Sequence, residues 1–175
     1  MASLPDISTL SSLSAEEQRK ILDALFEPSP AIHALVLPSM SAASFQSYDE
    51  FITHCYKVFE ALTVGPSHKT ELRSIIGSHP RLGAKKVESA QSAAEQAQLQ
   101  SGDATELAAL NEEYEATFPG LRYVVFVNGR GRPEIMENMR ERIARGDLAS
   151  EERAAVQAMC DIARDRAAKL QAVSR

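Results

Sequence analysis

The 175-residue chain contains no tryptophan, only two cysteines and few aromatic residues, which make up 6% of the sequence. Two cysteines, Cys55 and Cys160, are too few for a disulfide-dense scaffold or a cysteine-based zinc site. They could form one disulfide, but an acidic chain that begins without a secretory signal favours two reduced, buried thiols. No segment approaches the roughly 18 apolar residues that a membrane-spanning helix needs. The sequence therefore predicts no membrane partner.

Basic residues are also outnumbered, since 19 Lys and Arg face 24 Asp and Glu and give a net charge of −5. This acidic balance argues against a large nucleic-acid-binding surface. The chain has no glycine-rich phosphate-binding loop, and its four histidines, at positions 33, 54, 68 and 79, lack the spacing of metal ligands. The hydrophobic content of 44% is that of an ordinary globular protein. We therefore expect one domain over residues 1–175 that binds neither nucleic acid nor a metal ion.

Helical periodicity is the dominant pattern in the chain. Ser14 with Glu17 and Ser47 with Glu50 have the spacing of capping boxes, which begin helices. The second box precedes the strongest amphipathic stripe, made of Phe51, Ile52, Cys55, Val58, Phe59 and Leu62. Further helices are predicted after Pro30, through Leu72–Ile76, across 87–101, after Asp103, after Pro133 and from about Ser150. The predicted fold class is all-α, a single compact domain of about eight helices.

Prolines and glycines predict where these helices end. Pro38 is expected to end the second helix, because proline lacks the N–H that the helix needs. Gly77 is expected to adopt the left-handed conformation that closes a helix, and Gly146 ends the helix that Pro133 begins. The run Tyr123–Val127 is the only strand-like segment. Because one strand has no partner in this sequence, we predict a buried extended segment rather than a sheet.

His79 is the first residue that could carry chemistry. It lies between the predicted helix end at Gly77 and Pro80, so its backbone is held rigidly, as a general acid or base requires. The alternative is a loop histidine that only bonds the preceding helix end, and local features by themselves favour that alternative.

A second group is formed by Ser92, Glu95 and Gln96, whose offsets of three and four residues place them on one helix face. A hydroxyl, a carboxylate and an amide suit a ring with many N–H and C=O groups, although a solvated polar face is the simpler explanation. Arg166 extends the apolar stripe of the last helix and either points into a pocket or reaches solvent at the helix end. The remaining arginines of the last two helices, namely Arg142, Arg145 and Arg164, are interpreted as surface charges.

The order of these residues changes the interpretation, because the chain resembles the 2-oxo-4-hydroxy-4-carboxy-5-ureidoimidazoline (OHCU) decarboxylase family of uric acid breakdown. The resemblance covers about residues 15–170. The matching segments are His79-Pro80-Arg81-Leu82-Gly83, Ser92-Ala93-Ala94-Glu95-Gln96, Leu110-Asn111-Glu112-Glu113-Tyr114 with Phe118, Tyr123–Val127 with Asn128-Gly129-Arg130, and Ile162-Ala163-Arg164-Asp165-Arg166.

The resemblance implies an all-α enzyme, often a homodimer, that converts the small molecule OHCU to (S)-allantoin and CO2 without metal or organic cofactor. It implies that His79 is the general acid/base at the hydroxyl-bearing carbon. Glu95 would orient substrate N–H groups and set the protonation of the histidine, and Arg166 would bind a substrate oxygen or hold Glu95. The implied substrate-binding residues are Pro80, Ser92, Ala93, Ala94, Gln96, Tyr123, Val124, Val125, Phe126 and Val127.

The family occurs in peroxisomes and in the cytosol, so the implied location is peroxisomal or cytoplasmic. The last residues, Val173-Ser174-Arg175, are not the Ser-Lys-Leu peroxisomal address. The absence of a cofactor also follows from the substrate, because the electrons left by CO2 can move into its own neighbouring C=N and C=O groups. The unpaired backbone of 123–127 is expected to recognise the amides of the ligand.

Two other functions remain open at this level. In a helical interaction module, the stripe containing Phe51 and Phe59 would bind a partner helix, and Glu95 and Arg166 would lie far apart on the surface. An enzyme of the same fold could also act on another ureide, as a hydrolase or an isomerase.

Overall fold

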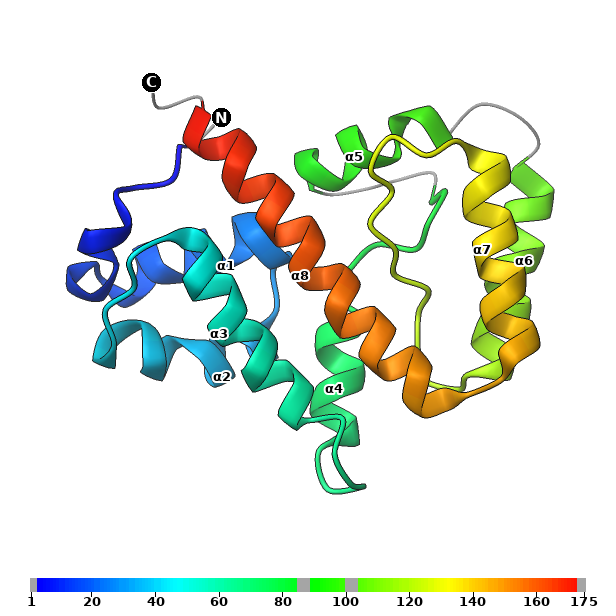
Figure 1. Cartoon of the computed structure of the whole chain (residues 1–175), viewed down its shortest axis with the longest axis horizontal. Coiled ribbons are helices and arrows are strands. Elements are labelled where there is room, and N and C mark those ends of the chain that lie inside the picture. Colours follow the sequence, from blue (N-terminus) through cyan, green and yellow to red (C-terminus); the bar gives the residue numbers. More distant parts are fainter. Residues whose placement is uncertain (1–2, 85–88, 100–103, 173–175) are drawn as a thin grey trace.

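Helix α8 (Leu148–Ala172) is the longest element and runs diagonally through the middle of the molecule (Figure 1). Helices α1 (Ala15–Phe26) and α3 (Tyr48–Ala61) pack along one side of α8. On the other side, α6 (Ala104–Thr117) and α7 (Arg132–Arg145) pack against each other. Helix α8 therefore separates two groups of helices and contributes residues to both.

The computed structural model describes residues 3–84, 89–99 and 104–172. Helix α2 (Pro30–Ala42) packs on α1 and on α4 (Lys69–Ile76), and the short 3-10 helix η1 (Ile7–Ser12) packs on α2. Helix α5 (Ala90–Gln96) continues into a 3-10 turn, η2 (Ala97–Leu99). The described residues thus form eight α-helices and no strand, which confirms the predicted all-α fold.

One hydrophobic core joins these helices, and the predicted stripe of α3 lies inside it. Phe51, Cys55 and Phe59 are completely buried, and the Phe59 ring meets Phe26 of α1 edge to face at 5.4 Å between ring centres. Because the protein's own helices cover this stripe, it is not a surface for a partner helix. Cys55 and Cys160 are both buried and free, and burial raises the pKa of the Cys160 thiol to about 12.

The predicted helix starts are confirmed by their caps. The Ser14 side chain accepts from the Glu17 N–H while the Glu17 carboxylate accepts from the Ser14 N–H, a complete capping box. Ser47 likewise caps α3, although the Glu50 carboxylate accepts from the Gln46 N–H, one residue earlier than a capping box would have it. Of the predicted helix over 87–101, α5 and η2 are seen; positions 87, 88, 100 and 101 and the predicted cap Asp103 lie outside the described residues.

Two predictions about helix ends are wrong, although α4 does end at Gly77 as predicted. Helix α2 continues past Pro38 to Ala42, because Met40 in its last turn is completely buried and this packing outweighs the one hydrogen bond that proline removes. Gly77 has a right-handed φ of −70° rather than a left-handed one, because the chain tightens into a turn in which the Ser78 N–H bonds the Ile75 carbonyl.

The ends of the last two helices agree better with the sequence. Gly146, with φ of 62°, closes α7 in the left-handed conformation as predicted. Helix α8 begins at Leu148, two residues before the predicted Ser150, because the Asp147 carboxylate accepts from the Ala149 and Ser150 N–H groups.

The segment 121–127 runs through the molecule as extended chain and pairs with no strand in the described structure, as predicted. Arginine side chains supply hydrogen bonds that a neighbouring strand would otherwise make. Arg142 Nη1 donates to the Val124 carbonyl at 3.2 Å, and Arg130 donates to the Phe126 and Val127 carbonyls at 2.5 and 3.2 Å. The extended segment is thus held from α7 and from its own following turn.

Arg142 itself corrects the sequence interpretation, which placed it on the surface. It is buried, and its Nε donates to both carboxylate oxygens of Glu151, at 3.1 and 2.8 Å. The Tyr114 hydroxyl donates to the same carboxylate at 2.7 Å, and the Tyr123 ring lies 4.7 Å from the guanidinium carbon. Arg142 and Glu151 belong to different helices, so no helical spacing could reveal the pair.

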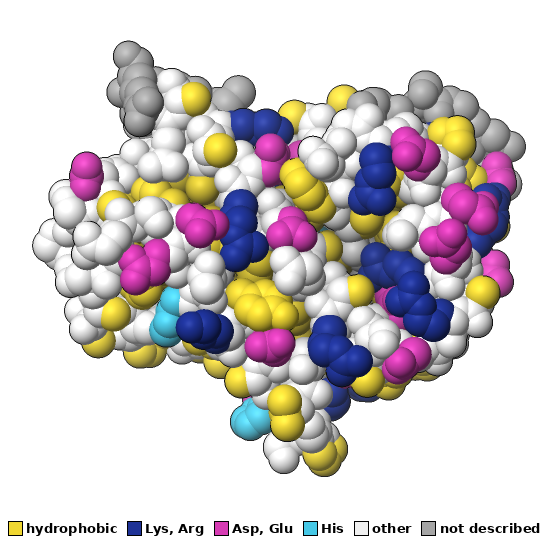
Figure 2. All heavy atoms as spheres, in the orientation of Figure 1, with side chains coloured by type: hydrophobic (Ala, Val, Ile, Leu, Met, Phe, Trp, Pro, Cys, Tyr) yellow, Lys and Arg dark blue, Asp and Glu magenta, His cyan; other side chains and the backbone are white. Residues whose placement is uncertain are grey.

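On the surface, basic and acidic side chains are interspersed over the face shown in Figure 2. Large apolar side chains are strongly exposed at two described positions, Val64 and Leu148. Among the described helices, none combines the length and the apolar character that a bilayer span would require.

Candidate active site

A cavity of about 410 Å³ lies where four parts of the chain meet. Its wall is built by the turn after α4, by α5, by the extended segment with its following turn, and by the last part of α8. The polar side chains in this wall are His79, Ser92, Glu95, Gln96, Asn128, Asp165 and Lys169. This volume is in the range of small-molecule sites.

His79 is held in this wall by hydrogen bonds of its backbone. The backbone N–H of His79 donates to the Ile76 carbonyl, and the His79 carbonyl accepts from Arg122 Nη1 at 2.7 Å. The same Arg122 nitrogen also donates to the Gly77 carbonyl. His79 is only 4% exposed, and its Nε2 is buried with no hydrogen-bond partner in the described structure. The rigid mount predicted from the sequence is therefore present, and one ring nitrogen is unpaired.

The environment of His79 keeps the imidazole neutral at pH 7. Burial, together with the nearby positive charges of Arg166 and Arg122, lowers the pKa of His79 to about 4 against the opposing charge of Glu27. A neutral imidazole can accept a proton at physiological pH, which an imidazolium cannot.

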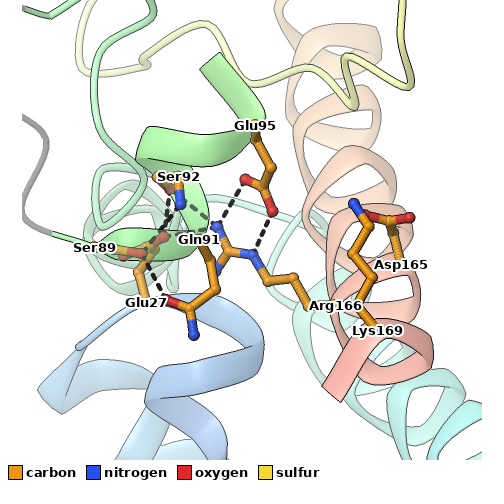
Figure 3. A network of polar contacts seen from close by, with 8 residues as sticks. All are labelled: Glu27, Ser89, Gln91, Ser92, Glu95, Asp165, Arg166 and Lys169. Carbon is orange, nitrogen blue, oxygen red and sulfur yellow. Dashed lines mark hydrogen bonds and ion pairs between the residues drawn. The ribbon is translucent and has the colours of Figure 1, made fainter. Parts of the chain in front are cut away.

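Glu95 and Arg166, 71 residues apart in the chain, form a bidentate ion pair at the cavity wall (Figure 3). Arg166 donates from Nε and Nη2 to the two Glu95 oxygens at 2.7 and 2.9 Å. Glu95 lines the cavity, whereas Arg166 lies behind it and is 2% exposed. Of the two roles predicted for Arg166, the contacts support holding Glu95 in place.

Glu27 completes this cluster and was missed by the sequence analysis. Its carboxylate accepts from Arg166 Nη2 at 2.7 Å and from the Ser92 hydroxyl at 2.5 Å, and the residue is 4% exposed. The signal that could have found it is its position just after α1, where the helix dipole disfavours a carboxylate. Burial of a charge at such a position requires a partner from elsewhere in the fold.

The other predicted members of the α5 group take different positions. Gln96 lines the cavity, and its side-chain oxygen accepts from the Gly83 N–H at 2.8 Å. Ser92 also lines it, but its hydroxyl proton is already donated to Glu27. Ala94 is in the wall, whereas Ala93 is exposed and is not part of the lining.

Pro80 and all five residues of 123–127 line the cavity. Three carbonyls of this segment are occupied by arginine side chains, while the main chain of Val125 makes no hydrogen bond with any described residue. Asp165 and Lys169 on the last turns of α8 also line the cavity, and Lys169 donates to Asp165 at 2.5 Å. The described residues contain no group of three or more His, Cys, Asp or Glu side chains placed to bind a metal ion.

A buried unpaired imidazole and a fixed carboxylate in the wall of one cavity of this size, within an all-α fold, form the arrangement of a small-molecule enzyme. The family model described as OHCU decarboxylase matches residues 11–168, so the chain belongs to the OHCU decarboxylase family. It is accordingly a carboxy-lyase of uric acid degradation that acts on a small ureidoimidazoline. No curated protein matches the chain.

Proposed function

We propose that this chain converts OHCU to (S)-allantoin and CO2, with His79 as the general acid/base. The observation that carries the proposal is the His79 Nε2, buried and unpaired beside the cavity that Glu95 and the extended segment share. A buried polar group without a partner in the free protein is costly, so its retention is explained by a partner on the substrate.

The chemistry needs one group that both takes and returns a proton. When the bond to the carboxylate breaks, its electron pair forms a double bond to the neighbouring ring carbon, and the former C=N pair moves to nitrogen, which takes a proton from water. Neutral His79 then accepts the proton of the hydroxyl group. The imidazolium delivers that proton to the neighbouring carbon as the carbonyl forms, so one proton is consumed in total and one CO2 is released. The face of delivery sets the (S) configuration.

Glu95 is proposed to orient the substrate rather than to react. Each of its oxygens already accepts one bond from Arg166, and a carboxylate oxygen can accept a second, so both can still accept from ureido or ring N–H groups. Its side chain is 20% exposed in the cavity wall, which leaves it accessible to a ligand. Arg166 fixes the plane of this carboxylate from behind.

The remaining contacts are proposed to come from Pro80, Ala94, Gln96 and the segment 123–127, without Ala93, which lies outside the cavity wall. Gln96 is turned by its bond from Gly83, so its amide nitrogen is the group left to donate to a ring carbonyl. The main chain of Val125 supplies one donor and one acceptor for an amide of the ligand. Pro80 would cover one face of the ring, and Ser92 would add a bond to the ring through its second lone pair.

Further properties are proposed from the family resemblance. The enzyme works without metal or organic cofactor, because the substrate accepts its own electrons. We expect one domain over residues 1–175, a homodimer, and a location in peroxisomes or cytoplasm.

The test is to add freshly generated OHCU to the purified protein and follow optical activity as allantoin accumulates. We expect the optical rotation of the solution to grow as the (S) enantiomer accumulates, whereas the racemic product of the spontaneous reaction gives no rotation. Racemic product at the spontaneous rate would contradict the proposal, and turnover of a different ureide alone would point to another reaction on the same fold.

A further inference from the structure

The backbone at Glu27 has a conformation that L residues rarely adopt. Glu27 follows directly after α1 with φ of 84° and ψ of 152°, a region that is essentially restricted to glycine. Asn128 is the one other non-glycine residue of the described chain with positive φ, at 47°, and asparagine tolerates that region. A glutamate has no such tolerance, so the local backbone favours glycine at position 27.

The helix dipole also opposes Glu27. The C-terminal end of a helix carries a partial negative charge, which disfavours a carboxylate at that end. Backbone strain and the helix dipole therefore both disfavour a glutamate at this position. The residue is stabilised instead by contacts with distant parts of the chain, namely Ser92 on α5 and Arg166 on α8.

These contacts reach the cavity in one further step. Arg166 Nη2 bonds Glu27, Ser92 and Glu95 at 2.7, 2.9 and 2.9 Å, so one nitrogen joins α1, α5 and α8 (Figure 3). Arg166 Nη1 is buried and has no partner in the described structure, so the guanidinium is held along its Nε–Nη2 edge alone. Loss of Glu27 would leave Glu95 and the Ser92 hydroxyl to fix that edge.

Helix α5 depends on this cluster more than the other helices do. It has seven residues, which is too short for an isolated helix to be stable in water. It also packs on other helices far less than α1 and α3 pack on α8. The polar cluster is thus a principal attachment of the element that carries Ser92 and Glu95.

We propose that Glu27 is a positioning residue of the active site, which fixes Arg166 and Ser92 and through them places Glu95 at the cavity wall. It does not line the cavity. The strained backbone is compensated by the bonds of this carboxylate to Arg166 Nη2 and to the Ser92 hydroxyl. The proposal rests on the proposed function for its kinetic consequence, and on the contacts of Glu27 for its structural one.

Glu27 also affects the charge around His79. The charged groups that act on this imidazole are Arg166 from α8, Arg122 from the segment after α6, and Glu27 from α1, which alone of the three favours the protonated form. Removal of the Glu27 charge therefore lowers the pKa of His79 below its value in the unchanged protein. The His79 pKa therefore reports whether the Glu27 charge acts at the site, and kcat reports whether Glu95 keeps its place.

Two substitutions test the role from opposite directions. Glu27→Gln keeps the shape and an acceptor oxygen but removes the charge, whereas Glu27→Gly removes the side chain and adopts the backbone conformation without strain. Glu16→Gln on the exposed face of α1 is the matched control. We expect kcat on OHCU to fall by about tenfold or more in both Glu27 variants, as small misplacements of an active-site group do, and to stay unchanged in the control.

The second readout needs no substrate. NMR titration of the His79 imidazole should give a lower pKa in Glu27→Gln than in the unchanged protein and the same pKa in Glu16→Gln. Wild-type kcat in folded Glu27→Gln would overturn the positioning role of Glu27, whatever the thermal stability and the His79 pKa. If Glu27→Gln does not fold, wild-type kcat in Glu27→Gly overturns it instead. An unchanged protein that forms only racemic allantoin would contradict the proposed function, and the His79 pKa in Glu27→Gln would still show whether the Glu27 charge acts at the site.

Discussion

The guanidinium of Arg166 holds the carboxylate of Glu95 through two parallel hydrogen bonds, at 2.7 and 2.9 Å, across 71 residues of the chain. This pair joins the long central helix α8 to the short helix α5 (Figure 3). The buried arginine therefore fixes the Glu95 carboxylate of this short helix in the wall of the cavity.

Arg166→Met is expected to destabilise the fold strongly. The substitution leaves the carboxylates of Glu27 and Glu95 without their cation, and loss of one partner of a buried pair costs about 3–5 kcal/mol. Arg164→Met is the control, because Arg164 is a third exposed and pairs with the exposed Asp49, a contact worth about 0–1 kcal/mol. Urea denaturation at neutral pH measures the free energy of unfolding of both variants. Equal losses would show that the buried ion pairs of Arg166 stabilise the fold no more than the exposed pair of Arg164.

His79→Ala should lower turnover of OHCU by about 10²- to 10⁴-fold with the fold intact, since that is the usual worth of general acid–base assistance. In the unchanged enzyme, the neutral imidazole is the active base and is lost by protonation. Because burial lowers the pKa of His79 to about 4 from an ordinary 6.5, kcat/KM should fall only as the pH approaches the lower value. A fall in activity centred near 6.5 would show that His79 has an ordinary environment, and full stereoselective activity in the variant would remove it from the mechanism.

The same lowered pKa predicts how stability depends on pH. Between 6.5 and about 4 the unfolded chain binds a proton at position 79 while the folded protein does not, so the free energy of unfolding falls as the pH falls. His79→Gln has no such group. We expect the unchanged protein to lose up to about 1.4 kcal/mol more per pH unit than the variant across this window. Denaturation curves at several pH values give both slopes, and parallel slopes would contradict the buried neutral state.

Arg142→Met should destabilise the protein by several kcal/mol, because it leaves Glu151 buried without a cation. It also frees the Val124 carbonyl, so binding of the product allantoin, measured by calorimetry, should weaken. Arg145→Met, one turn further along α7 and exposed, is the matched control for charge and helix position. Unaltered allantoin binding by folded Arg142→Met would show that the extended segment keeps its place without this contact.

Gly83→Ala and Gly65→Ala separate steric clash from backbone strain. Both glycines have φ of 74°, but a Cβ at Gly83 would lie 2.6 Å from Leu107 Cδ2, whereas a Cβ at Gly65 meets nothing within 4 Å. The strain is therefore shared, and only Gly83→Ala adds the overpacking, which typically costs about 1–3 kcal/mol. The difference in unfolding free energy between the two variants measures this clash. Equal losses would mean that the buried Leu107 moves aside freely.

The sequence predicted the helices where local signals are strong. The hydroxyl of Ser14 and the carboxylate of Glu17 meet within one turn, so their spacing is sufficient to place the start of α1. The lone extended segment was also predictable, because a sheet needs a second strand and the chain has no other strand-like run. Pro38 was misread because its penalty is local, whereas the burial of Met40 that outweighs it is tertiary.

The site divides in the same way. The sequence by itself determined the all-α class, the rigid mount of His79 and the shared helix face of Ser92 and Glu95, since each depends on residues only a few positions apart. Only the tertiary structure decided which charges are buried and with which partners. Glu27 and Arg142 look like surface residues in the chain, and the position of Arg166 fits either a pocket or solvent, but contacts with other helices stabilise all three charges away from water. Burial of a charge requires an opposite charge nearby in space, and spacing along the chain does not encode that distance.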